Sequence, residues 1–145
     1  MKRFKFSLDK LKGYKEQILE KEKNDLAQLR SQQRALEDEK HKVEETLRLS
    51  NEEFVKKSGN GMTVIQITMF KSYHQSLSQQ IKELEESIEK MDKRVQRQLK
   101  VVVEATKEVS SLEKLEEKQL EAYNFQVAKA EEQFISEYVI NSTYK

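Results

Sequence analysis

The chain has 145 residues, of which 37% are charged and 36% hydrophobic, and its formal net charge is +1. This many charged residues exclude a thick globular core, and the balanced charge argues against a general nucleic-acid binder, which would carry a basic stripe. The absence of Cys excludes a disulfide scaffold, and no apolar run approaches the ~20 residues that span a bilayer, so we expect a cytoplasmic protein without a transmembrane segment.

One tetrapeptide is suited to reverse the chain direction. The sequence has no Pro and three Gly, and two of these glycines lie in Ser-Gly-Asn-Gly at 58–61. Gly and Asn reach positive φ at low cost, so a helix end and a turn are predicted there. The predicted fold is all-α: two long helices, at about 7–57 and about 62–140, form an antiparallel coiled-coil hairpin. We expect a single domain over 1–145, with a frayed polar tail at 141–145.

The first predicted helix begins at Ser7, which is a good N-cap, with Asp9 in the first turn, where the helix dipole favours an anion. Phe6 and Leu11 have the spacing of a hydrophobic staple. Apolar residues then recur at intervals of seven, in three series: Leu8, Leu29, Leu36 and Val43; Phe4, Leu11 and Ile18; and Leu26, Leu47 and Phe54. The third series is displaced by one residue, which indicates a local change of period between Ile18 and Leu26.

The second predicted helix opens on a β-branched stretch. Residues 62–68 leave a short strand open as an alternative, although a lone strand has nothing to pair with. Two seven-residue series with charged flanks then indicate a coiled coil: Phe70, Leu77, Leu84 and Met91; and Ile81, Ile88, Val95, Val102 and Val109, with Ala105 and Leu112 rejoining the first. The apolar stripe continues as Leu120, Tyr123, Val127, Ala130, Phe134 and Tyr138.

A turn at 58–61 would pair residue i with about residue 119 − i, which places Phe4 against Leu115. The second helix would then continue about 25 residues past the first, with an apolar stripe that has no partner in the chain. An exposed stripe of this size usually marks an interaction surface, although a second copy of the chain is an alternative occupant.

Charge is also unevenly distributed along the two helices. Residues 1–15 carry six basic side chains and one aspartate, a net of +5, whereas residues 104–138 carry nine glutamates and four lysines, a net of −5. Complementary flanks of this kind favour an antiparallel register, and a solvated charge run is the alternative interpretation.

Neither a catalytic nor a metal-binding constellation is present in the sequence. The two histidines, His41 and His74, are 33 residues apart and neither lies in an HExxH motif, and no Gly-rich phosphate loop precedes a Lys-Ser or Lys-Thr pair. We therefore expect a non-enzymatic binding protein without a cofactor.

Four stretches of the sequence carry a resemblance to a known family. They are Phe4-x-Phe6-x-Leu8-x-x-Leu11, the Gly59-Asn60-Gly61 turn, Phe70-x-x-Tyr73-x-x-x-Leu77-x-x-x-Ile81, and the run from Leu112 to Tyr123. Together they resemble the FliJ family, small coiled-coil components of the bacterial flagellar type III export apparatus, over nearly the whole chain. One departure is Ser136-Glu137, where family members usually have an Asp-Glu pair.

The resemblance implies a stalk similar to the gamma-subunit shaft of the rotary ATP synthase. Its terminal end would bind a hexameric flagellar export ATPase, and its turn end the cytoplasmic domain of the export gate membrane protein. It would couple ATP hydrolysis to export, assist delivery of substrates by export chaperones, and act in motility and chemotaxis from a peripheral position at the cytoplasmic face of the cell membrane. The alternative is a generic cytoplasmic dimerising scaffold unrelated to secretion.

Two groups of apolar side chains are candidate contact sites. Aromatic residues crowded near the turn exceed what a two-helix seam needs, which predicts a partner site at Leu47, Phe54, Phe70, Tyr73 and Leu77. The resemblance implies that this partner is the export gate. For Phe70 and Leu77, a role in the seam alone is the alternative. The unpaired apolar stripe at the terminal end predicts a second contact site, and the resemblance implies the ATPase ring as its partner. Its residues are Phe4, Leu8, Leu120, Tyr123, Val127, Phe134 and Tyr138.

Overall fold

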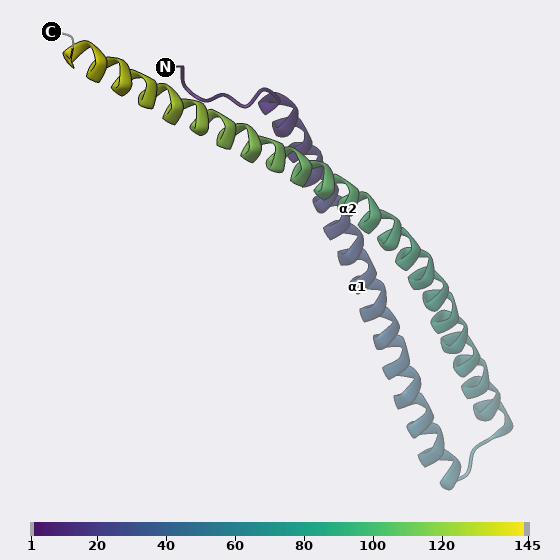
Figure 1. Cartoon of the computed structure of the whole chain (residues 1–145). Coiled ribbons are helices and arrows are strands. Elements are labelled where there is room, and N and C mark those ends of the chain that lie inside the picture. Colours follow the sequence, from purple (N-terminus) through teal and green to yellow (C-terminus); the bar gives the residue numbers. More distant parts are fainter. Residues whose placement is uncertain (1, 144–145) are drawn as a thin grey trace. The chain divides into compact units, whose positions relative to one another are not determined.

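A computed structural model of the protein describes residues 2–143 and contains two long helices. Helix α1 spans Asp9–Gly59, with 51 residues, and helix α2 spans Val64–Thr143, with 80 residues. Residues 60–63 join them, and α2 returns antiparallel to α1 (Figure 1). No strand occurs among the described residues, so the all-α hairpin is confirmed and residues 64–68 belong to α2.

Contacts divide the chain into two compact units, each of which contains a part of both helices. Of the described residues, the terminal unit combines 2–22 with 101–143, and the turn unit contains 23–100. Each unit is held by its own pairing of α1 with α2 and is described by itself below. The assignment of the whole chain to one domain stays a prediction.

Helix α1 begins two residues later than predicted, and Ser7 is not its N-cap. The amide of Lys12 donates to the carbonyl of Leu8 at 2.8 Å, so Leu8 holds the N-cap position. The hydroxyl of Ser7 lies instead 3.0 Å from Nε2 of Gln119, from which it accepts a hydrogen bond. The predicted cap was wrong because a side chain of α2 competes for the Ser7 hydroxyl.

The turn lies slightly later than predicted and ends in a capping motif. Gly61 has a φ of 89°, in the left-handed region that favours glycine. The amide of Gln66 donates to the Thr63 hydroxyl at 3.2 Å, and the amide of Thr63 donates to the Gln66 side chain at 3.0 Å. This reciprocal pair is a capping box, which satisfies two free amides at the start of α2 and makes Val64 its first residue.

The register of the two helices also differs from the prediction. In the turn unit, Gln33 bonds Asp92 and Lys40 pairs with Glu85, so paired residue numbers add to 125 rather than about 119. The shift follows from the loop at 60–63, because moving the fold point by a few residues moves every pairing by twice that amount. In the terminal unit, Phe4 accordingly contacts Tyr123 and not Leu115.

The seam between the helices is narrow. Among residues 2–143, six hydrophobic side chains are buried: Leu26, Leu77 and Val95 in the turn unit, and Phe6, Ala105 and Val109 in the terminal unit. All except Phe6 lie in the predicted seven-residue series, which confirms the pattern as the source of the pairing. Leu8, which was also predicted to lie in a seven-residue series, is 36% exposed because it is the N-cap and precedes the first turn of α1.

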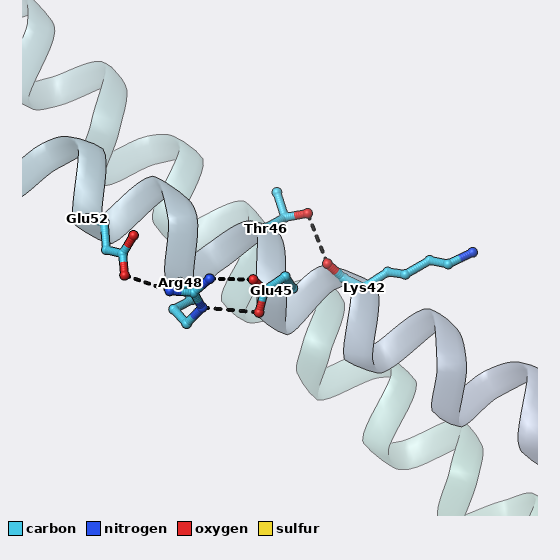
Figure 2. A network of polar contacts seen from close by, with 5 residues as sticks. All are labelled: Lys42, Glu45, Thr46, Arg48 and Glu52. Carbon is cyan, nitrogen blue, oxygen red and sulfur yellow. Dashed lines mark hydrogen bonds and ion pairs between the residues drawn. The ribbon is translucent and has the colours of Figure 1, made fainter.

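The exposed side of α1 carries a local charge network near its C-terminal end. Figure 2 shows Arg48 between two glutamates of its own helix, with Nη1 2.6 Å from Glu52 and Nε 3.1 Å from Glu45. Hydrogen bonding to Arg48 lowers the pKa of Glu45, and the same contact raises the pKa of Arg48. These i,i+3 and i,i+4 pairs stabilise a helix whose apolar face is thin.

At its other end α2 is longer than predicted. Residues 141–143 are helical, and the hydroxyls of Ser142 and Thr143 donate to the carbonyl of Val139 in the last turn. The remaining part of the predicted frayed tail, residues 144 and 145, lies outside the described residues.

Candidate interaction surfaces

In the terminal unit, residues 2–8 form a non-helical arm that contacts α2. The Tyr123 hydroxyl donates to the carbonyl of Lys2 at 2.6 Å, and the Tyr123 and Phe4 rings are 5.6 Å apart, tilted by 49°. Phe6 is only 7% exposed, although it precedes the helix. The arm is therefore held by one buried ring, one ring pair and hydrogen bonds from Tyr123 and Gln119.

Two ion pairs continue this pairing along the first turns of α1. Lys12 Nζ lies 2.6 Å from Glu116, and Lys15 Nζ lies 3.0 Å from Glu108, so the basic start of α1 does lie beside the acidic part of α2. The hydrogen bond to Glu116 raises the pKa of Lys12 above its ordinary value of 10.5. This contribution is present below pH 10.5 and is lost as the pH rises through the higher folded value.

The residues of the predicted terminal site fall into two groups, those that contact the arm and those that remain exposed. Tyr123, expected on the unpaired part of α2, lies instead against Phe4, because the register is shifted. Phe134 and Tyr138 are 70% and 68% exposed, and every residue from 128 to 143 is exposed. The unpaired stripe therefore begins after Tyr123. Val127, the first residue of the stripe after Tyr123, is half-buried.

The same part of α2 exposes further large apolar side chains that the sequence prediction did not include. They are Phe125, Ile135, Val139 and Ile140, each more than half exposed. Their positions fall outside the seven-residue stripe, which is why a search for that period missed them. Large apolar side chains therefore lie on more than one face of α2 after Tyr123.

At the turn end, two of the predicted aromatic residues contact each other. The rings of Phe54 and Phe70 are 5.4 Å apart in an edge-to-face arrangement, and Lys57 Nζ lies 5.6 Å from the Phe70 ring centroid. Tyr73 is 48% exposed, whereas Leu77 is 6% exposed and belongs to the seam. Leu47 is half-buried, so the five predicted residues form a surface with a seam behind it rather than one open patch.

A hollow of about 220 Å³ lies beside the Phe54–Phe70 pair. It is lined by Ser50, Asn51, Phe54, Phe70, Lys71 and His74. Ser50 is buried at a position where the seam pattern would otherwise place a large apolar side chain, and its small size leaves this space open. Four exposed apolar residues adjoin the turn and were not predicted as site residues: Val55, Val64, Ile65 and Met69.

The family model described as flagellar FliJ protein matches residues 4–143 of the chain. The chain belongs to the FliJ family. This FliJ chain is thus a component of the flagellar export apparatus, which acts in flagellum biogenesis and protein export, and its family is a structural export component rather than an enzyme. No curated protein and no solved structure matches it.

Two of the motifs that carried the resemblance meet in the FliJ terminal unit. Phe4 and Ser7 lie in the first motif, and Tyr123 and Gln119 lie at the end of the run from Leu112 to Tyr123; they are in contact through the ring pair and the hydrogen bonds described above. The spacing of each motif was readable from the sequence. Their contact was not, because it depends on the register.

The described residues of this FliJ chain contain no group of three or more His, Cys, Asp or Glu that could hold a metal ion. His41 is exposed, and His74 lines the hollow at the turn end. Within residues 2–143, neither helix is apolar over a length that could cross a membrane.

The arm of this FliJ chain is expected to detach when Tyr123 is truncated. Tyr123→Ala removes both the ring partner of Phe4 and the hydrogen bond to Lys2, and trypsin should then cleave after Lys5 several-fold faster than in the wild type. Tyr123→Phe keeps the ring and should give a smaller increase. The exposed Tyr14 provides the control as Tyr14→Ala, and equal cleavage rates in all four proteins would contradict the contacts of the arm.

Proposed function

We propose that this chain is a non-enzymatic stalk of the export apparatus with two partner surfaces. The terminal unit binds the ring of the hexameric flagellar export ATPase, and the turn unit binds the cytoplasmic domain of the export gate. The stalk couples ATP hydrolysis to export and assists delivery of chaperone–substrate complexes. It acts as a peripheral protein at the cytoplasmic face of the cell membrane.

The observation that carries the proposal is the unpaired part of α2. A two-helix protein needs its apolar side chains for the seam, yet Phe134 and Tyr138 are exposed where no part of α1 is available to cover them. Large exposed apolar patches are costly in solution and mark contact with a partner. A narrow helix with apolar side chains on more than one face fits the central opening of a ring and contributes no catalytic group of its own.

A second set of exposed apolar residues supports a separate partner at the turn. Tyr73 is 48% exposed beside the Phe54–Phe70 pair, and Met69 is 67% exposed on the same helix. Aromatic anchors dominate many interfaces, at roughly 2 kcal/mol or more each. The family membership supports the export gate as the partner, since the gate is the membrane component that faces cytoplasmic export proteins.

Tyr73→Ala is expected to weaken binding of the gate's cytoplasmic domain by about tenfold or more, because it removes an exposed aromatic side chain from the proposed interface. Helix content should be unchanged, since the ring is not part of the seam. Titration calorimetry with the purified gate domain measures the affinity, and circular dichroism measures the fold.

The matched control for Tyr73 is Tyr14→Ala, which removes an exposed tyrosine of the terminal unit. It should bind the gate domain like the wild type. Equal affinity of the Tyr73 variant would remove that residue from the site. The alternative of a dimerising scaffold is tested by light scattering, since a stalk acting within a ring should be monomeric, and a stable dimer with no affinity for the gate or the ATPase would favour the scaffold.

A further inference from the structure

We propose that the turn end binds an acidic segment of a partner protein. One large apolar side chain of that segment enters the hollow, and the carboxylates of the segment lie on either side of this side chain. This inference deepens the proposed gate contact and rests on it for the identity of the partner. It adds what that contact leaves open, namely the chemistry by which the turn end would recognise a peptide.

The shape of the hollow defines the apolar part of the ligand. About 220 Å³ is open between Ser50 and Asn51 on α1 and Phe70 and His74 on α2. The aromatic wall is fixed in place, since Phe70 packs edge-to-face on Phe54 and carries Lys57 on its ring. A rigid apolar wall beside a small serine provides space for one large side chain, and side chains that fill such pockets act as anchors.

The charge of the sequence that contributes Phe54, Phe70, Lys71 and His74 to the hollow defines the polar part. Between Glu53 and Glu83 the chain has no carboxylate and four lysines: Lys56, Lys57, Lys71 and Lys82. The two glutamates that precede this stretch are already paired, Glu52 with Arg48 and Glu53 with Lys57.

Within the described residues, Lys56, Lys71 and Lys82 make no ion pair, and Lys71 lines the hollow itself. An unpaired lysine in the lining of an apolar pocket is complementary to a carboxylate beside an apolar side chain. The occupant therefore combines negative charge with one bulky apolar group.

A peptide fits these features better than an anionic membrane. A membrane surface would be served by lysines and exposed apolar side chains alone, such as Val64 and Ile65 at the loop. It would not need a hollow that is closed at its base by the buried Ser50. The concave site lies on the paired helices behind the loop, where a side chain enters and a flat lipid surface does not.

The test uses the full chain and fluorescein-labelled peptides in an anisotropy titration. One peptide has glutamates on both sides of a single phenylalanine, the second has alanine in place of phenylalanine, and the third has lysines in place of the glutamates. Only the first should bind, and its NMR shift changes should centre on Ser50, Phe70 and Lys71. Vesicles of phosphatidylglycerol are titrated in parallel.

Two variants separate the apolar and the polar part of the site. Lys71→Glu should weaken the peptide by about tenfold through charge reversal, and Ser50→Leu should weaken it about tenfold by filling the hollow. Their controls are Lys90→Glu and Ser31→Leu, which change exposed positions of the same unit and should bind within about twofold of the wild type. If Ser50→Leu loses helix content, the peptide affinity of Lys71→Glu decides whether the proposal stands.

Each outcome distinguishes the inference from the proposed function. No binding of the acidic phenylalanine peptide, or binding that Lys71→Glu leaves unchanged, overturns the inference, even where the gate domain still binds and the proposed function stands. Binding of the vesicles alone also overturns it. Peptide binding with the expected variant effects, without any affinity for the gate domain, supports the recognition chemistry and removes the gate as its partner.

Discussion

Truncation after Asn124 is expected to abolish stimulation of the export ATPase while leaving the hairpin folded. The cut removes residues 125–145, which include the unpaired stripe with Phe134 and Tyr138. It keeps Tyr123 and Gln119, which hold the arm, so both units retain the contacts described for them. Stimulation is measured as the ratio of ATP hydrolysis by the purified ATPase with and without the stalk, and this ratio should fall to one.

Point variants show whether the effect belongs to a particular face of α2. Phe134 and Phe125 are 70% and 69% exposed, and their separation of nine residues places them on opposite sides of the helix. Phe134→Ala should lower the affinity for the export ATPase by about tenfold or more, and Phe125→Ala should lower it less. If the truncated chain stimulates hydrolysis as well as the full chain does, the unpaired part of α2 is not the ATPase surface.

Val95→Asp is expected to separate the helices of the turn unit. Val95 is 5% exposed, and a carboxylate at this position would lie in the apolar seam without a basic side chain to pair with it. An unpaired buried charge costs about 3–5 kcal/mol, a large part of the stability of a protein of this size. On heating, the variant should lose its helix signal in circular dichroism at a far lower temperature than the wild type.

The matched control for Val95 is Val101→Asp, since Val101 lies on the same helix and is 44% exposed. This variant should melt close to the wild type, because its carboxylate remains in water. A small shift for Val95→Asp, similar to that of Val101→Asp, would show that the seam at this point does not hold the helices together.

The helices and their apolar face were predictable because both follow from periodicity. Leu26, Leu77, Val95 and Val109 lie in the seven-residue series and are buried in the structure. A repeat of this kind specifies which face of each helix is covered, whatever the partner. The glycine cluster at 58–61 likewise predicted where the chain reverses, to within two or three residues.

The pairing of the helices was not predictable at the same accuracy. A seam of repeating apolar residues fits several registers, and the choice depends on where the loop ends. The Thr63–Gln66 capping box would have shown this, because it makes Val64 the first residue of α2. Without it, the turn was placed too early, and Phe4 was assigned to Leu115 instead of Tyr123.

The candidate sites were predicted only in part for a related reason. Tyr73, Phe134 and Tyr138 were identified from aromatic content and from the stripe, and they are exposed. The hollow beside Phe70 was missed because it is produced by Ser50, a small polar residue that no apolar pattern includes. The arm was missed because Ser7 is equally suited to cap a helix and to bond a side chain of α2.

The thinness of the seam has a consequence for how the molecule opens. No described side chain has less than 2% of its surface exposed, so no part of either unit is anchored by a fully enclosed group. Opening a few turns of α1 from α2 then breaks only the contacts of those turns, and amide hydrogen exchange should show a gradient of protection rather than one cooperative value. Such partial opening lets the chain separate locally and close again without passing through the unfolded state.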